Sequence, residues 1–267
     1  PGDYAGSGEN DGAPGPTPTP IPVLSPPAPL PTASPLPTAC CPLPIISGFG
    51  DYDGDGSSDI AVYRPSSGLW AIRNLTRCYF CPRGVPVTGD YDGDRIADPA
   101  VFRPESGLWA IRDHSRFYFG GTDDMPVPAD FDGDGRTDGA VFRSAAAGLW
   151  ALKDLSRIYF GRSGDLPVPA DYDGDGSSDI AVFRPSAGLW ANQGQFRIYF
   201  GGPDDVPIPA DFDGDGSSDI AVFRPSVGLW AVRNLSRFYF GSTASFPLSF
   251  DPDGDYYADP AIFRGDD

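Results

Sequence analysis

The chain has 267 residues, an apolar content of 40% and a formal net charge of −18. This acidity argues against nucleic acid and anionic membranes as partners, and no apolar run is long enough to span a bilayer. The length fits one repeat domain with a tail, and because the sequence starts at Pro1 rather than Met, we expect a processed mature product.

Residues 1–44 are predicted to form a proline-rich extended tail. This segment holds 14 prolines, which favours polyproline II. Its most strand-like piece, Ile21–Leu24, and its least proline-dense part, Gly2–Ala13, are candidates for adding a strand to the sheet of a neighbouring copy; the alternative is a spacer that lies along its own domain. Hydroxyl groups among prolines are typical of O-glycosylated stalks, and here they belong to Thr17, Thr19, Ser25, Thr32, Ser34 and Thr38.

Four cysteines follow, two at the end of the tail and two in the first repeat. Cys78 and Cys81 are three residues apart on an expected strand and so face opposite sides. We therefore expect each of them to pair with Cys40 or Cys41, with a strained Cys40–Cys41 bridge as the alternative. Disulfides of this kind predict an oxidising, extracellular compartment, whereas a zinc site is disfavoured by the ligand spacing.

Residues 45–267 carry an internal repeat with a period of about forty residues. The phrase Asp-x-Asp-Gly-Asp-x-x-x-Asp occurs six times, with the units starting near 45, 85, 125, 166, 206 and 246. Alternating carboxylates on a tight turn are the ligand set that Ca²⁺ prefers, since this hard cation takes six to eight oxygen ligands. We expect up to six calcium sites, matched to extracellular calcium concentrations.

Each predicted site uses four aspartates and the backbone carbonyl of the seventh residue of the phrase. The six ligand sets are Asp51, Asp53, Asp55, Ser57 and Asp59; Asp90, Asp92, Asp94, Ile96 and Asp98; Asp130, Asp132, Asp134, Arg136 and Asp138; Asp171, Asp173, Asp175, Ser177 and Asp179; Asp211, Asp213, Asp215, Ser217 and Asp219; and Asp251, Asp253, Asp255, Tyr257 and Asp259.

Two loops depart from the pattern at the sixth position. Arg95 and Tyr256 stand where the other four loops have glycine. A residue other than glycine with a positive φ costs roughly 1–2 kcal/mol. The loops that begin at Asp90 and Asp251 are therefore predicted to be the weaker sites.

Each repeat also contains four short apolar stretches bounded by Gly, Pro, Asp or Ser. In the fourth repeat they are Leu166–Ala170, Ile180–Arg184, Gly188–Ala191 and Arg197–Phe200. Four strands per forty residues predict an all-β fold, a β-propeller of about six four-stranded blades. The sixth repeat ends after its second strand, so its blade is expected to be incomplete and to present an open sheet edge.

The calcium loop followed by Asp-Ile-Ala-Val-Phe-Arg resembles the FG-GAP/VCBS-type repeats of integrin-like propellers. The resemblance covers about residues 45–267 and implies a calcium-binding propeller in which each loop joins the first two strands of a blade. The Gly-Ala-Pro motif of that family is replaced in this chain by Phe-Arg-Pro or Tyr-Arg-Pro, as in the segment that ends at Arg64-Pro65. The resemblance therefore implies the fold and the metal sites and no integrin-like ligand site.

Two side chains recur once in each repeat outside the loops. The tryptophan of each Gly-Leu-Trp-Ala segment is interpreted as packing between blades, with a sugar-stacking platform as the alternative. The arginine that ends each second strand is expected to pair with loop aspartates or to cap carbonyls. Two sequons, at Asn74 and Asn234, are candidates for N-glycosylation.

No catalytic motif is present, and the single histidine, His114, is interpreted as a surface residue. We therefore predict that the chain is not an enzyme. It is expected to be a secreted structural or adhesive protein that assembles head to tail with itself, through its tail and its open sixth blade. The alternative is a calcium-dependent lectin that binds glycans.

Overall fold

A computed structural model describes residues 50–145 and 147–264, which lie within one compact unit, Thr38–Asp267. The described residues form an all-β protein in which a single 3-10 turn, Pro185–Ala187, is the one helical element. No described helix is long and apolar enough to cross a membrane. The predicted tail, residues 1–44, lies outside the described residues.

The strands recur in four roles. The short first strands are β4 (Val85–Pro86), β8 (Met125–Pro126), β12 (Leu166–Pro167) and β16 (Val206–Pro207). The second strands are β1 (Ala61–Arg64), β5 (Ala100–Arg103), β9 (Ala140–Arg143), β13 (Ala181–Arg184) and β17 (Ala221–Arg224). The third strands are β2 (Leu69–Ile72), β6 (Leu108–Ile111), β10 (Leu149–Leu152), β14 (Leu189–Asn192) and β18 (Leu229–Val232). The fourth are β3 (Thr76–Tyr79), β7 (Ser115–Tyr118), β11 (Ser156–Tyr159), β15 (Arg197–Tyr199) and β19 (Ser236–Tyr239).

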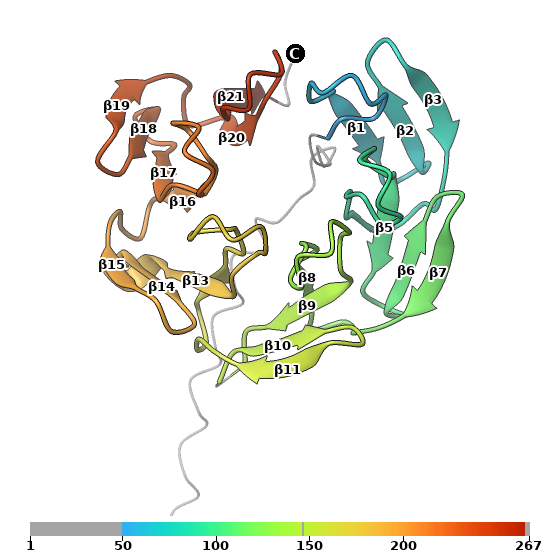
Figure 1. Cartoon of the computed structure of the whole chain (residues 1–267), viewed down its shortest axis with the longest axis horizontal. Helices are drawn as coiled ribbons and strands as arrows, with labels where there is room; N and C mark the ends of the chain where they lie inside the picture. The colour runs from blue at the N-terminus through green and yellow to red at the C-terminus, as the bar shows by residue number, and fades with distance from the viewer. Residues whose placement is uncertain (1–49, 146, 265–267) are drawn as a thin grey trace, which may run out of the picture. The chain divides into compact units, whose positions relative to one another are not determined.

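These strands form five antiparallel sheets, which we call blades one to five, arranged as a ring (Figure 1). Blade one is β1–β3, and blades two to five are β4–β7, β8–β11, β12–β15 and β16–β19. The sixth repeat forms only the two-stranded sheet of β20 (Ser245–Phe250) and β21 (Asp259–Arg264). The arrangement is thus a propeller of five blades, and the expected count of six is wrong. The reason lies in the sequence, because the sixth repeat has no Gly-Leu-Trp segment to build a third strand.

The core lies between successive blades and is built on the five tryptophans. Each of them is completely buried. In blade four, Trp190 is the direct cross-strand partner of Phe183, with ring centroids 5.0 Å apart, and its indole N–H donates to the carbonyl of Phe200 at 3.0 Å. Buried aromatic pairs of this kind stabilise a core beyond their area alone. The packing interpretation of the tryptophans is confirmed, and their burial rules out a sugar-stacking role.

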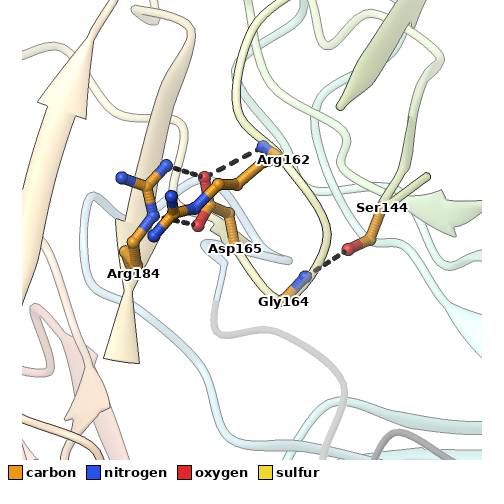
Figure 2. A network of polar contacts seen from close by, with 5 residues as sticks. All are labelled: Ser144, Arg162, Gly164, Asp165 and Arg184. Carbon is orange, nitrogen blue, oxygen red and sulfur yellow. Dashed lines mark hydrogen bonds and ion pairs between the residues drawn. The ribbon is translucent and has the colours of Figure 1, made fainter. Parts of the chain in front are cut away.

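Buried ion pairs fix the connections between blades. Asp165 ends the connection from blade three to blade four, and its carboxylate accepts from Nε and Nη2 of Arg184 at 2.7 and 2.8 Å (Figure 2). The Asp165 side chain is fully buried, and it also accepts from the backbone N–H of Arg162. Arg143 with Asp124 and Arg224 with Asp205 repeat this bidentate pair. The hydrogen bonds to aspartate raise the pKa of these three guanidinium groups. Burial opposes this shift but is outweighed, so each pKa lies above its usual value.

The expectation for the repeated arginines is therefore corrected in one respect. Their acidic partners lie in the connections between blades and not in the Asp-rich loops. Arg103 follows the other expected mode, because its Nε donates to the carbonyl of Pro82 at 3.0 Å.

We predict that Arg184→Met destabilises the protein by about 3–5 kcal/mol, because it leaves the Asp165 carboxylate buried and uncompensated. Arg64→Met is the matched control, since Arg64 holds the same position in blade one and contacts no acidic side chain in the described part of the chain. Urea denaturation measures both. Equal losses from the two variants would show that the ion pair contributes nothing specific.

Candidate metal centre

Each Asp-rich loop precedes the second strand of its repeat, and its first aspartate organises the turn. In the loop of blade four, the carboxylate of Asp171 accepts from the backbone N–H groups of Gly174 and Gly176 at 2.7 and 2.9 Å. Both glycines have positive φ, 75° and 91°, which glycine adopts without steric cost. The predicted curling of the loop around its acidic side chains is confirmed.

The remaining aspartates complete the turn. Asp173 and Asp175 accept from N–H groups two residues further along the loop. The closing aspartate, Asp179, reaches back and accepts from the N–H of Tyr172 at 3.1 Å. Tyr172 in turn anchors the loop to the first strand, since its hydroxyl donates to the carbonyl of Val168 at 2.9 Å.

The carboxylates converge within the loops. In five loops, oxygens of three aspartates lie within 4.8 Å of one another: Asp51, Asp53 and Asp59; Asp90, Asp92 and Asp94; Asp130, Asp132 and Asp138; Asp171, Asp173 and Asp175; and Asp211, Asp213 and Asp219. Carboxylates so close together repel one another unless a cation lies between them. Hard oxygen donors in this number fit calcium better than a softer metal.

The pKa values of the closing aspartates reflect this crowding. Burial raises the pKa of Asp179 above its usual value, and the neighbouring carboxylates of Asp173 and Asp175 add to the rise. The same direction holds for Asp59, Asp98, Asp138, Asp219 and Asp259. At Asp51, burial opposes the shift, but four backbone N–H donors outweigh it and lower the pKa.

Consecutive loops are joined to one another. The carbonyl of the first aspartate of each loop accepts from the N–H of the eighth residue of the next loop. These bonds are Ala97 to Asp51, Thr137 to Asp90, Ser178 to Asp130, Ser218 to Asp171, Ala258 to Asp211 and Ser58 to Asp251, at 2.5–2.7 Å. The last of them connects the sixth repeat back to the first, so the six loops form a closed ring.

The seventh residues of the loops, predicted as carbonyl ligands, lie at the same junctions. The side chain of Ser217 lies against Gly174 of the preceding loop. The equivalent neighbours are Ile96 at Gly54, Arg136 at Gly93, Ser177 at Gly133, Tyr257 at Gly214 and Ser57 at Gly254. Their role as ligands stays a prediction, but their side chains space one loop from the next.

The predicted strain in two loops is present in the backbone. Arg95 has a φ of 68° and Tyr256 a φ of 71°, in the region that the other four loops fill with glycine. Both backbone N–H groups still donate to the first aspartate of their loop, at 2.7 and 2.9 Å. The two loops thus adopt the common turn at a steric cost.

The other predicted sites lie away from the loops. Asn74 and Asn234 are exposed at hairpin turns with φ of 60° and 64°, which leaves both amides accessible. Cys78 and Cys81 are partly buried and form no disulfide with each other or with any other described residue, and Arg112 donates to the sulfur of Cys78. Their predicted partners, Cys40 and Cys41, and the predicted O-glycosylation sites lie outside the described residues, so the pairing and the modifications stay predictions.

One surface feature was missed at the level of sequence. The fourth strands expose five tyrosines, Tyr79, Tyr118, Tyr159, Tyr199 and Tyr239, each 72–77% accessible. These tyrosines belong to an Arg-x-Tyr-Phe motif that recurs in five repeats. The motif alone does not show that the tyrosine faces solvent, which depends on its position in the fourth strand of the blade.

No family profile matches the chain, and no curated protein matches its sequence. Among solved structures, an Agrocybe aegerita lectin that recognises non-reducing terminal N-acetylglucosamine is similar, with a TM-score of 0.54 and 16% identity over 83% of this chain and 75% of the lectin. BBS1N in complex with ARL6DN gives a TM-score of 0.49 with 12% identity, over 83% of this chain and 97% of BBS1N. The V. cholerae biofilm matrix protein Bap1 gives 0.36 with 17% identity, over 71% of this chain and 37% of Bap1.

The first of these likenesses supports the propeller fold. At such low identity it says nothing of ligand or activity.

We predict that Arg95→Gly strengthens cation binding at the loop of Asp90, because removing the strain of a positive φ recovers roughly 1–2 kcal/mol. Arg95→Ala is the control, since it removes the same side chain but keeps a Cβ. Calorimetric titration with calcium measures both variants. Six equal sites in the unchanged chain would contradict the prediction.

Proposed function

We propose that the chain is an extracellular structural or adhesive protein whose propeller is stabilised by calcium in six loops. The observation that carries this proposal is the closed ring of acidic loops, in which the backbone of each loop is hydrogen-bonded to the backbone of the next and carboxylates converge within the loops. At millimolar calcium and extracellular affinities, each ion would contribute roughly 0.4–1.4 kcal/mol. Six such contributions are comparable with the whole net stability of a domain.

Calcium and protons compete for the same aspartates, and the sign of the pH effect follows. The closing aspartates have raised pKa values in the folded chain, so each of them binds protons more tightly in the metal-free fold than in the unfolded chain. Their contribution to stability is therefore complete below about pH 4, the ordinary pKa of aspartate, and is lost as the pH rises through the raised pKa values. Calcium offsets that loss, because it binds the ionised form.

We therefore predict that the melting temperature in calcium exceeds that in chelator, and that the difference is larger at neutral pH than at about pH 4, the usual aspartate pKa. Differential scanning calorimetry measures both temperatures, and equimolar magnesium serves as the control cation. Identical melting in calcium and chelator at the higher pH would overturn the calcium proposal.

The sixth repeat is the proposed site of assembly. Strand β21 has no third strand beside it in the described part of the chain, and its Phe263 is only partly buried, whereas the equivalent Phe223 of blade five is fully buried. The two-stranded sheet leaves Phe246 44% exposed. A further strand from a neighbouring copy can pair with such an edge and cover such a face. We propose that the tail of that copy, residues 1–44, supplies this strand.

Tail-driven assembly predicts ordered polymers of the full chain in millimolar calcium and single particles once residues 1–44 are deleted. A head-to-tail contact that does not close on itself propagates as a filament. Negative-stain electron microscopy distinguishes the two. Single closed propellers from the full chain would instead place the tail on its own sixth repeat.

A calcium-dependent lectin is the second candidate. It is favoured by the five exposed tyrosines on the fourth strands, and the N-acetylglucosamine-binding lectin from Agrocybe aegerita provides a precedent for this fold. Neither observation concerns the tail, so glycan binding by the non-assembling form would separate the two functions.

A further inference from the structure

One face of each blade presents the same six residues, and we call it the rim face. Three lie in one row across the second, third and fourth strands, and three lie in the adjacent row. In blade four, Arg184 pairs with Leu189 and Leu189 with Tyr199, while Val182 pairs with Ala191 and Ala191 with Arg197. Strands are about 4.8 Å apart and alternate residues about 6.8 Å, so the six side chains form one continuous patch.

The rim face is identical in all five blades. Its other members are Val62, Arg64, Leu69, Ala71, Arg77 and Tyr79; Val101, Arg103, Leu108, Ala110, Arg116 and Tyr118; Val141, Arg143, Leu149, Ala151, Arg157 and Tyr159; and Val222, Arg224, Leu229, Ala231, Arg237 and Tyr239.

Both faces contribute to the core between blades, because the rim valines and alanines of blades two to five are buried. The opposite face nevertheless varies between blades. Its third-strand position holds Ile72, Ile111, Leu152, Asn192 and Val232. The fourth-strand arginines and tyrosines of the rim face are solvent-exposed, so core packing does not require those side chains. Their identity in every blade indicates a role at the surface.

The rim face lines a cavity. On blade three, a cavity of about 270 Å³ is lined by five rim residues and three residues of the preceding connection: Val141, Arg143, Leu149, Ala151, Arg157, Phe119, Gly120 and Asp124. The equivalent residues of blade five line a cavity of about 150 Å³. Each lining is apolar apart from two guanidinium groups and the buried carboxylate that pairs with one of them.

Summed over the five blades, the charge of the rim faces is positive although the chain is acidic. On each rim face two arginines are opposed by at most one buried aspartate, as with Asp124 at Arg143. The exposed Asp123 and Asp204 also act on Arg143 and Arg224 and balance the charge on blades three and five, whereas Arg83 and Arg162 add positive charge in the connections that enter blades two and four. The second-strand arginine is held in place by its aspartate through Nε and Nη2, and no described residue accepts from its Nη1.

We propose that the rim faces bind an acidic polysaccharide, one anionic sugar unit per blade. This rests on the second proposed function and names its ligand class. A guanidinium fork matches a carboxylate or sulfate group, and an exposed tyrosine ring offers a flat surface to the C–H face of a pyranose. Five repeated sites on one ring suit a polymer, because weak contacts add up through multivalency.

The experiment uses the full chain in millimolar calcium, with hyaluronan, dextran sulfate and neutral dextran immobilised in parallel. Hyaluronan carries carboxylates and dextran sulfate carries sulfates, so the two surfaces identify the anionic group. We expect salt-sensitive binding to one or both and at least tenfold weaker binding to dextran, about 1.4 kcal/mol. Equal binding to dextran, or binding to none of the three, overturns the proposal.

Two sets of variants locate the site. The triple variant R157Q, R197Q and R237Q removes three rim arginines, and its matched control, R73Q, R112Q and R233Q, removes the same charge at the hairpin turns. We expect at least about a tenfold loss from the first and little from the second. Equal losses from both triple variants overturn the site.

The triple variant Y159A, Y199A and Y239A separates sugar recognition from simple ion exchange. Binding that requires the arginines and not the tyrosines contradicts saccharide recognition. Circular dichroism in calcium confirms that each variant is folded, and because calcium-dependent melting is measured separately, failure of the glycan proposal leaves the calcium proposal standing.

Discussion

The whole structure depends on one short hydrogen bond that is repeated six times. In it, the backbone carbonyl of the first aspartate of one loop accepts from a backbone N–H group of the next loop. Through it the turn that gathers four carboxylates also fixes the distance between neighbouring blades. The bond from Ser58 to Asp251 spans nearly the whole described chain and closes the ring. Because the loops are bonded to one another, repulsion between the carboxylates of one loop also acts on the neighbouring loops. A cation bound in one loop would therefore reduce the repulsion there and stabilise its neighbours as well.

How far the sequence predicted this arrangement depended on where each interaction lies along the chain. The carboxylate clusters were predictable because all of their residues fall within nine positions, and the positive φ of Arg95 followed from the glycines at the same place in other loops. The packing of Trp190 against Phe183 also followed from its place in a strand. In contrast, the partner of Arg184 was predicted wrongly as an aspartate of the loops. Its partner, Asp165, lies in a connection between blades, and the repeated sequence does not specify the path of that connection.

The blade count and the rim face needed the structure for a different reason. A blade requires pairing between strands. The sixth repeat contains sequence for only two strands, so its sheet has two strands. The rim residues are spread over three strands, and their relation appears only when Arg184, Leu189 and Tyr199 fall into one row. Identical residues that are scattered in sequence thus become one surface through register alone.

The connections between blades also divide the ring into unequal parts. Those that enter blades three, four and five end in a buried carboxylate bound to arginine, whereas the one that enters blade two has Gly84, and the one that enters the sixth repeat has the neutral Ser245. Local opening requires the loss of the contacts that cross a joint. We therefore expect the ring to open on heating first at the two connections that lack a buried ion pair, so that blades two to five form a cooperative folding unit whose amide hydrogens exchange last.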